Sequence, residues 1–173
     1  MTLPDTPRRR VNFFEGRLVT AEDLGSEQQA SRERVWLHNR MLHGAGVVAG
    51  FEVSVEGEEL VVSPGMAIDG FGREIVLTGG GARLDGSDVV AESHGRVHLA
   101  VSWAEEPDDE VIGPDGPVPG HFVERPRLSL REIGAAGADA DHVVLARVHR
   151  AGTVLVADGS VRRHVRRSGH GDR

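Results

Sequence analysis

The fold is decided where a helical pattern gives way to an alternating one, in "TAEDLGSEQQASRERVWLHNRMLHGAGVVAGFEVSV" (Thr20–Val55). Thr20 is followed three residues later by Asp23, which is a capping-box pattern with a shorter acid. Gly44 supplies the left-handed residue that ends many helices. These two signals predict one helix over residues 21–43, about 34 Å long. After Gly44 apolar and polar residues alternate, which predicts strands.

The two halves of this predicted helix differ in polarity. Residues 25–34 are nearly all polar, whereas residues 35–42 include most of the large apolar side chains. A helix with so polar a first half is not buried in the core of a monomer. We therefore expect it to project into solvent or to lie against a partner.

The rest of the chain reads as short strands joined by turns. Alternation predicts strands at 51–56, 60–63, 66–69, 73–77, 95–106, 125–133, 142–150 and 151–159. Two segments predict exposed loops: the glycine-rich residues 78–88, and residues 105–121 with four prolines and six acids. The fold class expected is mainly β (α+β), with a long N-terminal helix followed by an antiparallel β-sandwich or barrel-like domain. We divide the chain into an N-terminal arm (1–19), the helix (20–43), the antiparallel β-domain (44–165) and a frayed basic tail (166–173).

Composition narrows the functional classes. The 173 residues suit one domain, and the absence of cysteine excludes disulfides and thiolate metal sites. No apolar run approaches a membrane span, and no secretory signal is apparent, so we expect a bacterial cytoplasmic protein. All 20 basic residues are Arg, and residues 11–160 hold 12 of them against 25 acids. An acidic body between arginine-rich ends is not typical of nucleic-acid-binding domains.

"WLHNRMLHG" (Trp36–Gly44) gathers reactive side chains, but their spacing argues against a shared metal. His38 and His43 are five residues apart, which places their rings about 140° apart on an α-helix. Zinc-binding pairs on a helix are four residues apart and need further ligands. We expect instead that a helix–sheet junction is formed by His38, Asn39, His43 and Gly44.

Other chemical motifs have simple structural interpretations. The G-x-S-x-G pattern of a presented serine nucleophile is absent, and the glycines at 44, 46 and 50 lack dinucleotide-binding spacing. In "DGFGRE" (Asp69–Glu74) we expect a reverse turn in which Asp69 binds turn amides and Arg73 pairs with an acid. We predict no catalytic residue, cofactor or metal, and a turn element that comprises Pro64, Gly65, Asp69, Gly72 and Arg73.

Three strings together resemble a known family. "FFEGRLVTAEDL" (Phe13–Leu24), "WLHNRMLHGAGVVAGFEV" (Trp36–Val53) and "LVVSPGMAIDGFGREIVL" (Leu60–Leu77) are similar to proteins of phage tails and phage-tail-like contractile injection systems. The resemblance covers roughly residues 12–165. It implies a tail-fibre- or baseplate-associated component, with a helix feeding a G-V-V-x-G strand and then a hairpin element.

The function expected is therefore structural and non-enzymatic. The chain would act as an adaptor in a phage-tail-like particle, and cell lysis would release that particle. The adaptor would dock on other subunits and on copies of itself. The expected docking residues are Phe13, Phe14, Leu18, Arg32 and Trp36. One alternative is a small-ligand or glycan-binding β-module that uses His38, Asp69, Arg73 and Trp103, and the least favoured is a hydrolase or metalloenzyme.

Overall fold

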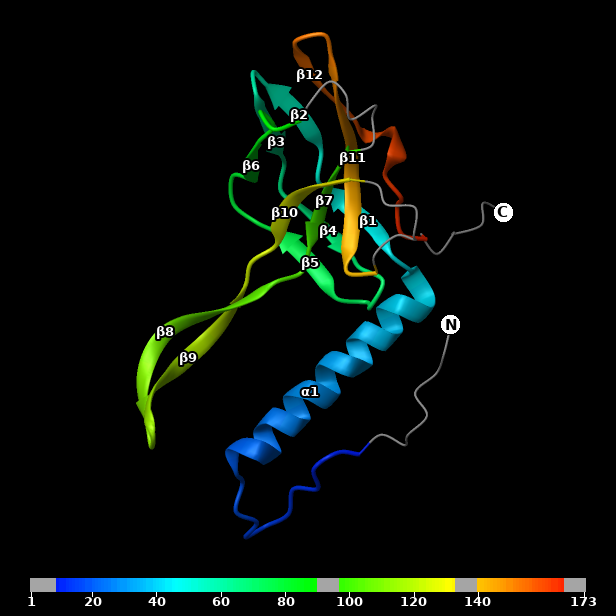
Figure 1. Cartoon of the computed structure of the whole chain (residues 1–173). Coiled ribbons are helices and arrows are strands. Elements are labelled where there is room, and N and C mark those ends of the chain that lie inside the picture. The colour runs from blue at the N-terminus through cyan, green and yellow to red at the C-terminus, as the bar shows by residue number, and fades with distance from the viewer. Residues whose placement is uncertain (1–8, 90–96, 133–139, 167–173) are drawn as a thin grey trace, which may run out of the picture.

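A single long helix precedes the strands in the computed structural model, which describes residues 9–89, 97–132 and 140–166 (Figure 1). Helix α1 (Ala21–His38) continues into a π-helical turn, η1 (Asn39–His43). The capping box is formed: the Thr20 hydroxyl accepts from the Asp23 amide at 3.2 Å, and the Asp23 carboxylate accepts from the Thr20 amide at 3.1 Å. Helical structure thus occupies the predicted residues. No helix in the described part of the chain is both long and apolar enough to span a membrane.

Twelve strands follow in the described residues, and every pairing between them is antiparallel. They form four sheets, in the orders β1-β4-β5, β2-β3-β6, β10-β7-β11-β12 and β8-β9. The predicted mainly β fold, a helix followed by antiparallel sheets, is confirmed. The strands are β1 (Gly46–Gly50), β2 (Val53–Glu56), β3 (Glu59–Val62), β4 (Gly65–Ile68), β5 (Glu74–Leu77), β6 (Ala82–Asp85), β7 (Val97–Ser102), β8 (Glu105–Gly113), β9 (Gly116–Glu124), β10 (Arg127–Glu132), β11 (His142–Ala151) and β12 (Val154–Asp158), with a 3-10 turn, η3 (Gly159–Val161), after the last.

One apolar core joins the first three of these sheets. Alternate residues of β7 point into it, because side chains of a strand alternate between its two faces. In β11 a bulge places the consecutive residues Leu145 and Ala146 both in the core. The fully buried large side chains come from β1, β3, β5, β7 and β11 and from the β1–β2 link: Val47, Phe51, Leu60, Val62, Ile75, Leu99, Val101, Leu145 and Val148. By contrast, α1 contains no buried residue, so the helix lies outside this core.

Two segments predicted as loops contain strands. Residues 105–121 lie in the hairpin β8–β9, which projects from the body in Figure 1. A two-residue turn makes Gly113↔Gly116 a hydrogen-bonded pair, so Pro117 and Pro119 fall at positions whose amide would point away from β8. The missing N–H groups of these two prolines therefore remove no hydrogen bond between β8 and β9. Within residues 78–88, β6 pairs with β3. This pairing is a long-range contact, so the local glycine content alone predicts a loop instead.

The end of the described chain lies beside β1. The Val47 amide donates to the Arg163 carbonyl at 2.7 Å, and the Val165 amide donates to the Val47 carbonyl at 3.1 Å. The Arg166 amide donates to the His43 carbonyl at 3.0 Å, so the first residue of the predicted tail is bonded to the helix end. The remainder of that tail, and residues 1–8 of the arm, lie outside the described residues.

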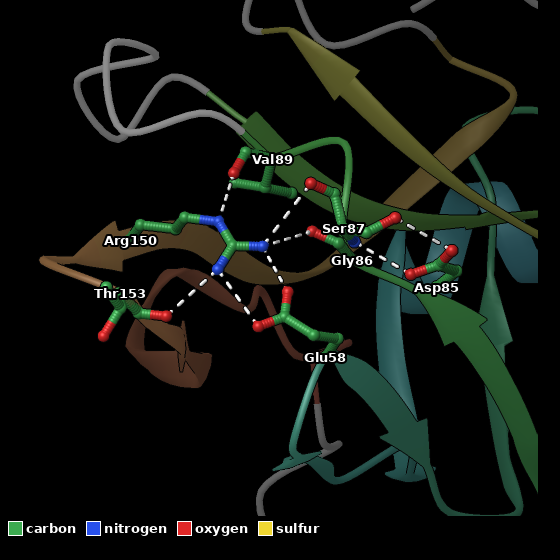
Figure 2. Close-up of polar contacts among 7 residues, drawn as sticks. All are labelled: Glu58, Asp85, Gly86, Ser87, Val89, Arg150 and Thr153. Carbon is green, nitrogen blue, oxygen red and sulfur yellow. Dashed lines mark hydrogen bonds and ion pairs between the residues drawn. The ribbon is translucent and has the colours of Figure 1, made fainter.

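Arg150 of β11 fastens two sheets and a connecting segment together (Figure 2). Its Nε donates to the Val89 carbonyl at 2.6 Å, and Nη1 donates to the Thr153 carbonyl at 3.1 Å. The guanidinium also makes a two-pronged ion pair with Glu58, in the β2–β3 turn. Hydrogen bonding to Glu58 raises the pKa of Arg150, and the same bond lowers the pKa of Glu58. A planar fork with five donors is required for this set of partners.

We expect Arg150→Lys to lower the thermal unfolding midpoint by roughly 3–6 °C, because an ammonium keeps the charge but cannot reach all of these acceptors. The matched control is Arg83→Lys. Arg83 also bridges two carboxylates, those of Glu56 and Glu59, but its side chain is 53% exposed against 15% for Arg150. Differential scanning calorimetry should show a shift for Arg150→Lys alone. Equal shifts for the two variants would contradict this role.

Candidate functional site

The turn between β4 and β5 is organised by one buried carboxylate. Asp69 is fully buried, at 0% exposure. Its Oδ1 accepts from the amides of Phe71 and Arg73, both at 2.9 Å, and its Oδ2 accepts from Arg73 Nε at 2.6 Å. A buried carboxylate is stable only when its oxygens are bonded in this way. The turn is therefore held in one conformation by Asp69.

The end of α1 packs directly on this turn. Asn39 Nδ2 donates to the Gly72 carbonyl and to Glu74 Oε1, both at 3.1 Å. The approach is so close that a Cβ on Gly72 would lie 2.0 Å from the Trp36 carbonyl oxygen. Gly72 also has a positive φ of 88°, a conformation that favours glycine. The junction predicted at the helix end thus has its partner in the Asp69–Arg73 turn.

Aromatic and charged side chains extend this contact to Trp103, in the link between β7 and β8. The rings of Trp36 and Trp103 meet edge to face, with centroids 6.4 Å apart. The Arg73 guanidinium lies 5.0 Å from the ring centroids of both Phe71 and Trp103. Because Arg73 also pairs with Asp69, its charge is shared between a carboxylate and two aromatic faces.

An ion pair ties the helix to the base of the β8–β9 hairpin. Arg32 Nη2 lies 3.0 Å from Glu105 Oε1. Hydrogen bonding to Glu105 raises the pKa of Arg32, and the charge of Glu124 acts in the same direction. Two of the predicted docking residues, Arg32 and Trp36, therefore make contacts within the chain. They hold the helix against the base of the hairpin and against the link that precedes it.

The expected separation of His38 and His43 is wrong. Their ring centroids lie 5.4 Å apart. The α-helical spacing assumed for them does not apply, because η1 is a π turn closed by a bond from the Gly44 amide to the Asn39 carbonyl at 3.0 Å. Bonds from residue i to i+5 bring residues five apart onto nearly the same face. Gly44 has a φ of 72° with an extended ψ of −178°, so the chain leads straight toward β1.

The predicted turn element is split between two places. Asp69, Gly72 and Arg73 lie in the turn on which the helix end packs, whereas Pro64 and Gly65 lie at the other end of β4. There the Pro64 carbonyl accepts from the Phe51 amide at 3.2 Å, and Gly65 pairs with Gly50. Sequence reasoning missed Glu105 as the partner of Arg32, and only the excess of acids in that segment pointed to it.

The described part of the arm, residues 9–19, exposes its apolar side chains. Phe13, Phe14 and Leu18 are 51%, 63% and 84% exposed. Arg17 fixes the arm to the helix start: it lies 2.7 Å from Asp23 Oδ1, and its Nη1 donates to the Asn12 carbonyl at 2.8 Å. Three of the predicted docking residues are therefore free to contact another molecule.

The residues named for glycan or metal chemistry are already engaged. The Asp69 oxygens are occupied by turn amides and by Arg73, and both Arg73 and Trp103 are packed in the junction. Within the described residues, no group of three or more His, Asp or Glu is placed to hold a metal ion. The geometry favours a rigid junction that presents two projecting elements.

No family model and no curated protein matches the chain. Solved structures share its fold. One is a chain of the type VI secretion system TssK–TssF–TssG baseplate subcomplex, at TM-score 0.54 and 17% identity, covering 87% of this chain and 60% of that chain. A second is the crystal structure of TssK, at TM-score 0.51 and 12% identity, covering 87% of this chain and 40% of that chain. A third, from the baseplate complex of the same secretion system, has TM-score 0.51 and 17% identity, covering 88% of this chain and 58% of that chain.

These similarities confirm the predicted resemblance at the level of the fold: its neighbours are baseplate proteins of a phage-tail-like contractile injection system. The chain spans about two fifths to three fifths of the length of the chains it matches.

Proposed function

We propose that this protein is a non-enzymatic structural component of a phage-tail-like contractile injection particle. It acts in the bacterial cytoplasm as a baseplate- or fibre-associated adaptor, through protein–protein docking and as a homo-oligomer. The observation that carries the proposal is the likeness of its fold to chains of type VI secretion baseplate complexes. Those chains are subunits of multi-protein assemblies.

The projecting elements support a docking role. Helix α1 buries none of its residues within the chain, although it is 18 residues long. The arm adds Phe13, Phe14 and Leu18 at its far end, where large apolar side chains are exposed to water. Clustered exposed apolar residues mark interaction sites on soluble proteins. We assign these three residues as anchors for neighbouring subunits, with α1 lying along the same partner.

The proposal is tested by purifying the tagged chain from its native host. We expect it to co-purify with sheath, tube and baseplate proteins identified by mass spectrometry, in particles that negative-stain microscopy shows to be tail-like. Phe13→Ser with Phe14→Ser should lower the recovery of those proteins at least tenfold, because both rings lose their apolar contacts.

Val154→Ser is the matched control. Val154 is 61% exposed, as much as the two rings, but it lies on β12, far from the arm in Figure 1. Recovery should be unchanged for this variant. A wild-type chain that brings down no particle component would refute the proposed function, and equal losses for both variants would refute the role of the arm.

A further inference from the structure

The β8–β9 hairpin lacks the support that such an element normally needs. Among the described strands, none pairs with the outer edge of β8 or β9. A lone two-stranded hairpin is marginally stable in water and gains stability from a surface packed on one of its faces. Among the described residues, ion pairs from the rest of the chain hold the hairpin at its base, where Arg32 contacts Glu105 and Arg127 contacts Glu106. The rest of the hairpin is open to a partner.

One face of the hairpin is apolar. Pro107 pairs directly with Phe122, and Val111 pairs directly with Val118. These pairs are four residues apart along each strand, so strand alternation places both on the same face. Phe122 is 61% exposed, Val111 46% and Val118 42%. Glu105 and Glu124 pair at the base of the same face and act on Arg32, so this face is turned toward α1.

The hairpin is also strongly acidic. Residues 105–124 contain seven Asp or Glu and no Arg, while the whole chain has a net charge of −7. Asp108 and Glu110 are exposed near its middle, on the face opposite Phe122. Because the hairpin is a single two-stranded layer, their charge also acts at the apolar face, within a screening length of about 10 Å at 0.1 M salt. A ligand for this surface must therefore combine apolar side chains with positive charge.

The arm of this same protein has that chemistry. Residues 9–19 carry three Arg against one Glu, together with the exposed Phe13, Phe14 and Leu18. Arg9 and Arg10 are themselves exposed. Within one chain, Arg17 holds the arm at the first turn of α1, and Figure 1 draws the arm and the hairpin on opposite sides of the helix. A second copy is therefore the molecule that can bring the two surfaces together.

We infer that the basic, apolar arm of one copy docks on the apolar face of the acidic β8–β9 hairpin of a second copy. This inference rests on the proposed function, for which it names the self-association surface. Apolar contact supplies affinity and the opposite charges select the partner surface and its orientation. Because the two surfaces differ, a reciprocal exchange of arms closes a two-fold dimer, whereas a one-way exchange leads to a ring or an open chain of copies.

Sedimentation velocity of the purified full-length chain tests this. We expect multiples of the 18.6 kDa monomer mass at 50 mM NaCl, and dissociation at 500 mM NaCl because the opposing charges are screened. Phe122→Ser should raise the dissociation constant at least tenfold. Ile112→Ser is the matched control: Ile112 is 86% exposed, more than Phe122, but lies on the opposite face of the hairpin. It should change the constant less than twofold.

Charge reversal tests the pairing itself. Arg9→Glu with Arg10→Glu should weaken association at least tenfold, and so should Asp108→Arg with Glu110→Arg. A chain carrying all four changes should associate within about threefold of wild type, because each surface then meets its complement. Circular dichroism of each variant separates loss of association from loss of folding.

The outcomes separate this inference from the proposed function. A monomeric wild-type chain that still co-purifies with the particle overturns the inference alone. So does a hairpin that binds only a different subunit in a Phe122-dependent manner. Equal effects of Phe122→Ser and Ile112→Ser, or no restoration in the four-fold variant, also overturn it.

Discussion

Asp69→Ala is expected to lower the free energy of unfolding by about 3–4 kcal/mol. The substitution removes a buried carboxylate that accepts three hydrogen bonds. It leaves two turn amides and Arg73 without their acceptor. Since the Arg73 side chain is 19% exposed, its charge keeps some access to water, which holds the loss to the lower part of the range for broken buried pairs. Urea denaturation followed by tryptophan fluorescence measures it.

The matched control for this prediction is Asp85→Ala. Asp85 makes the same kind of local turn, with its Oδ1 accepting from the Ser87 amide at 2.8 Å, but it is exposed and pairs with no arginine among the described residues. The backbone bond to Ser87 lowers the pKa of Asp85. Asp85→Ala should lower the free energy of unfolding by less than a third of the decrease expected for Asp69→Ala. Comparable losses would show that the turn itself, rather than burial of the charge, stabilises the fold.

Local signals in the sequence predicted the parts of the fold that are decided locally. The Thr20–Asp23 capping box involves residues three apart, and the Asp69–Arg73 turn involves residues four apart. Each is completed by its own neighbours in the chain. The alternation that predicted a strand at 95–106 is also local, and it puts Val97, Leu99 and Val101 on one face, which the structure shows in the core.

The predictions that were wrong concern features that depend on long-range contacts, which a local sequence pattern does not indicate. His38 and His43 come together because the helix changes to a π turn where Asn39 reaches Gly72, 33 residues away. The hairpin forms although its composition is typical of a loop, because Pro117 and Pro119 of β9 fall where no hydrogen bond to β8 is needed.

The predicted docking set was divided for a similar reason. The sequence predicts Arg32 and Trp36 as docking residues together with Phe13, Phe14 and Leu18 of the arm. Their partners, Glu105 and Trp103, are more than 60 residues away in the sequence. The structure instead separates a junction, which fixes the direction of the helix and the hairpin, from an exposed arm at the far end of the helix.

Gly72→Ala tests how far this junction depends on close approach of the backbone. We expect a loss of about 3–5 kcal/mol, which combines two costs. A residue with a Cβ at a φ of 88° is strained by about 1–2 kcal/mol. The added carbon would also lie 2.0 Å from the Trp36 carbonyl oxygen, so the helix must move, as in an overpacked core.

Gly57→Ala isolates the first cost from the second. Gly57 has a φ of 65°, and a Cβ there would meet no atom within 4 Å. We expect it to lose only the strain, about 1–2 kcal/mol. Gly72→Ala should also weaken the near-ultraviolet circular dichroism of the Trp36–Trp103 pair, because the helix that carries Trp36 is displaced from Trp103. If the two variants lose the same free energy of unfolding and both keep the near-ultraviolet signal, the turn can accept a Cβ at residue 72 without displacing the helix. The angle between helix and β-body would then have to be set by Asn39 and Arg32 instead of by backbone contact.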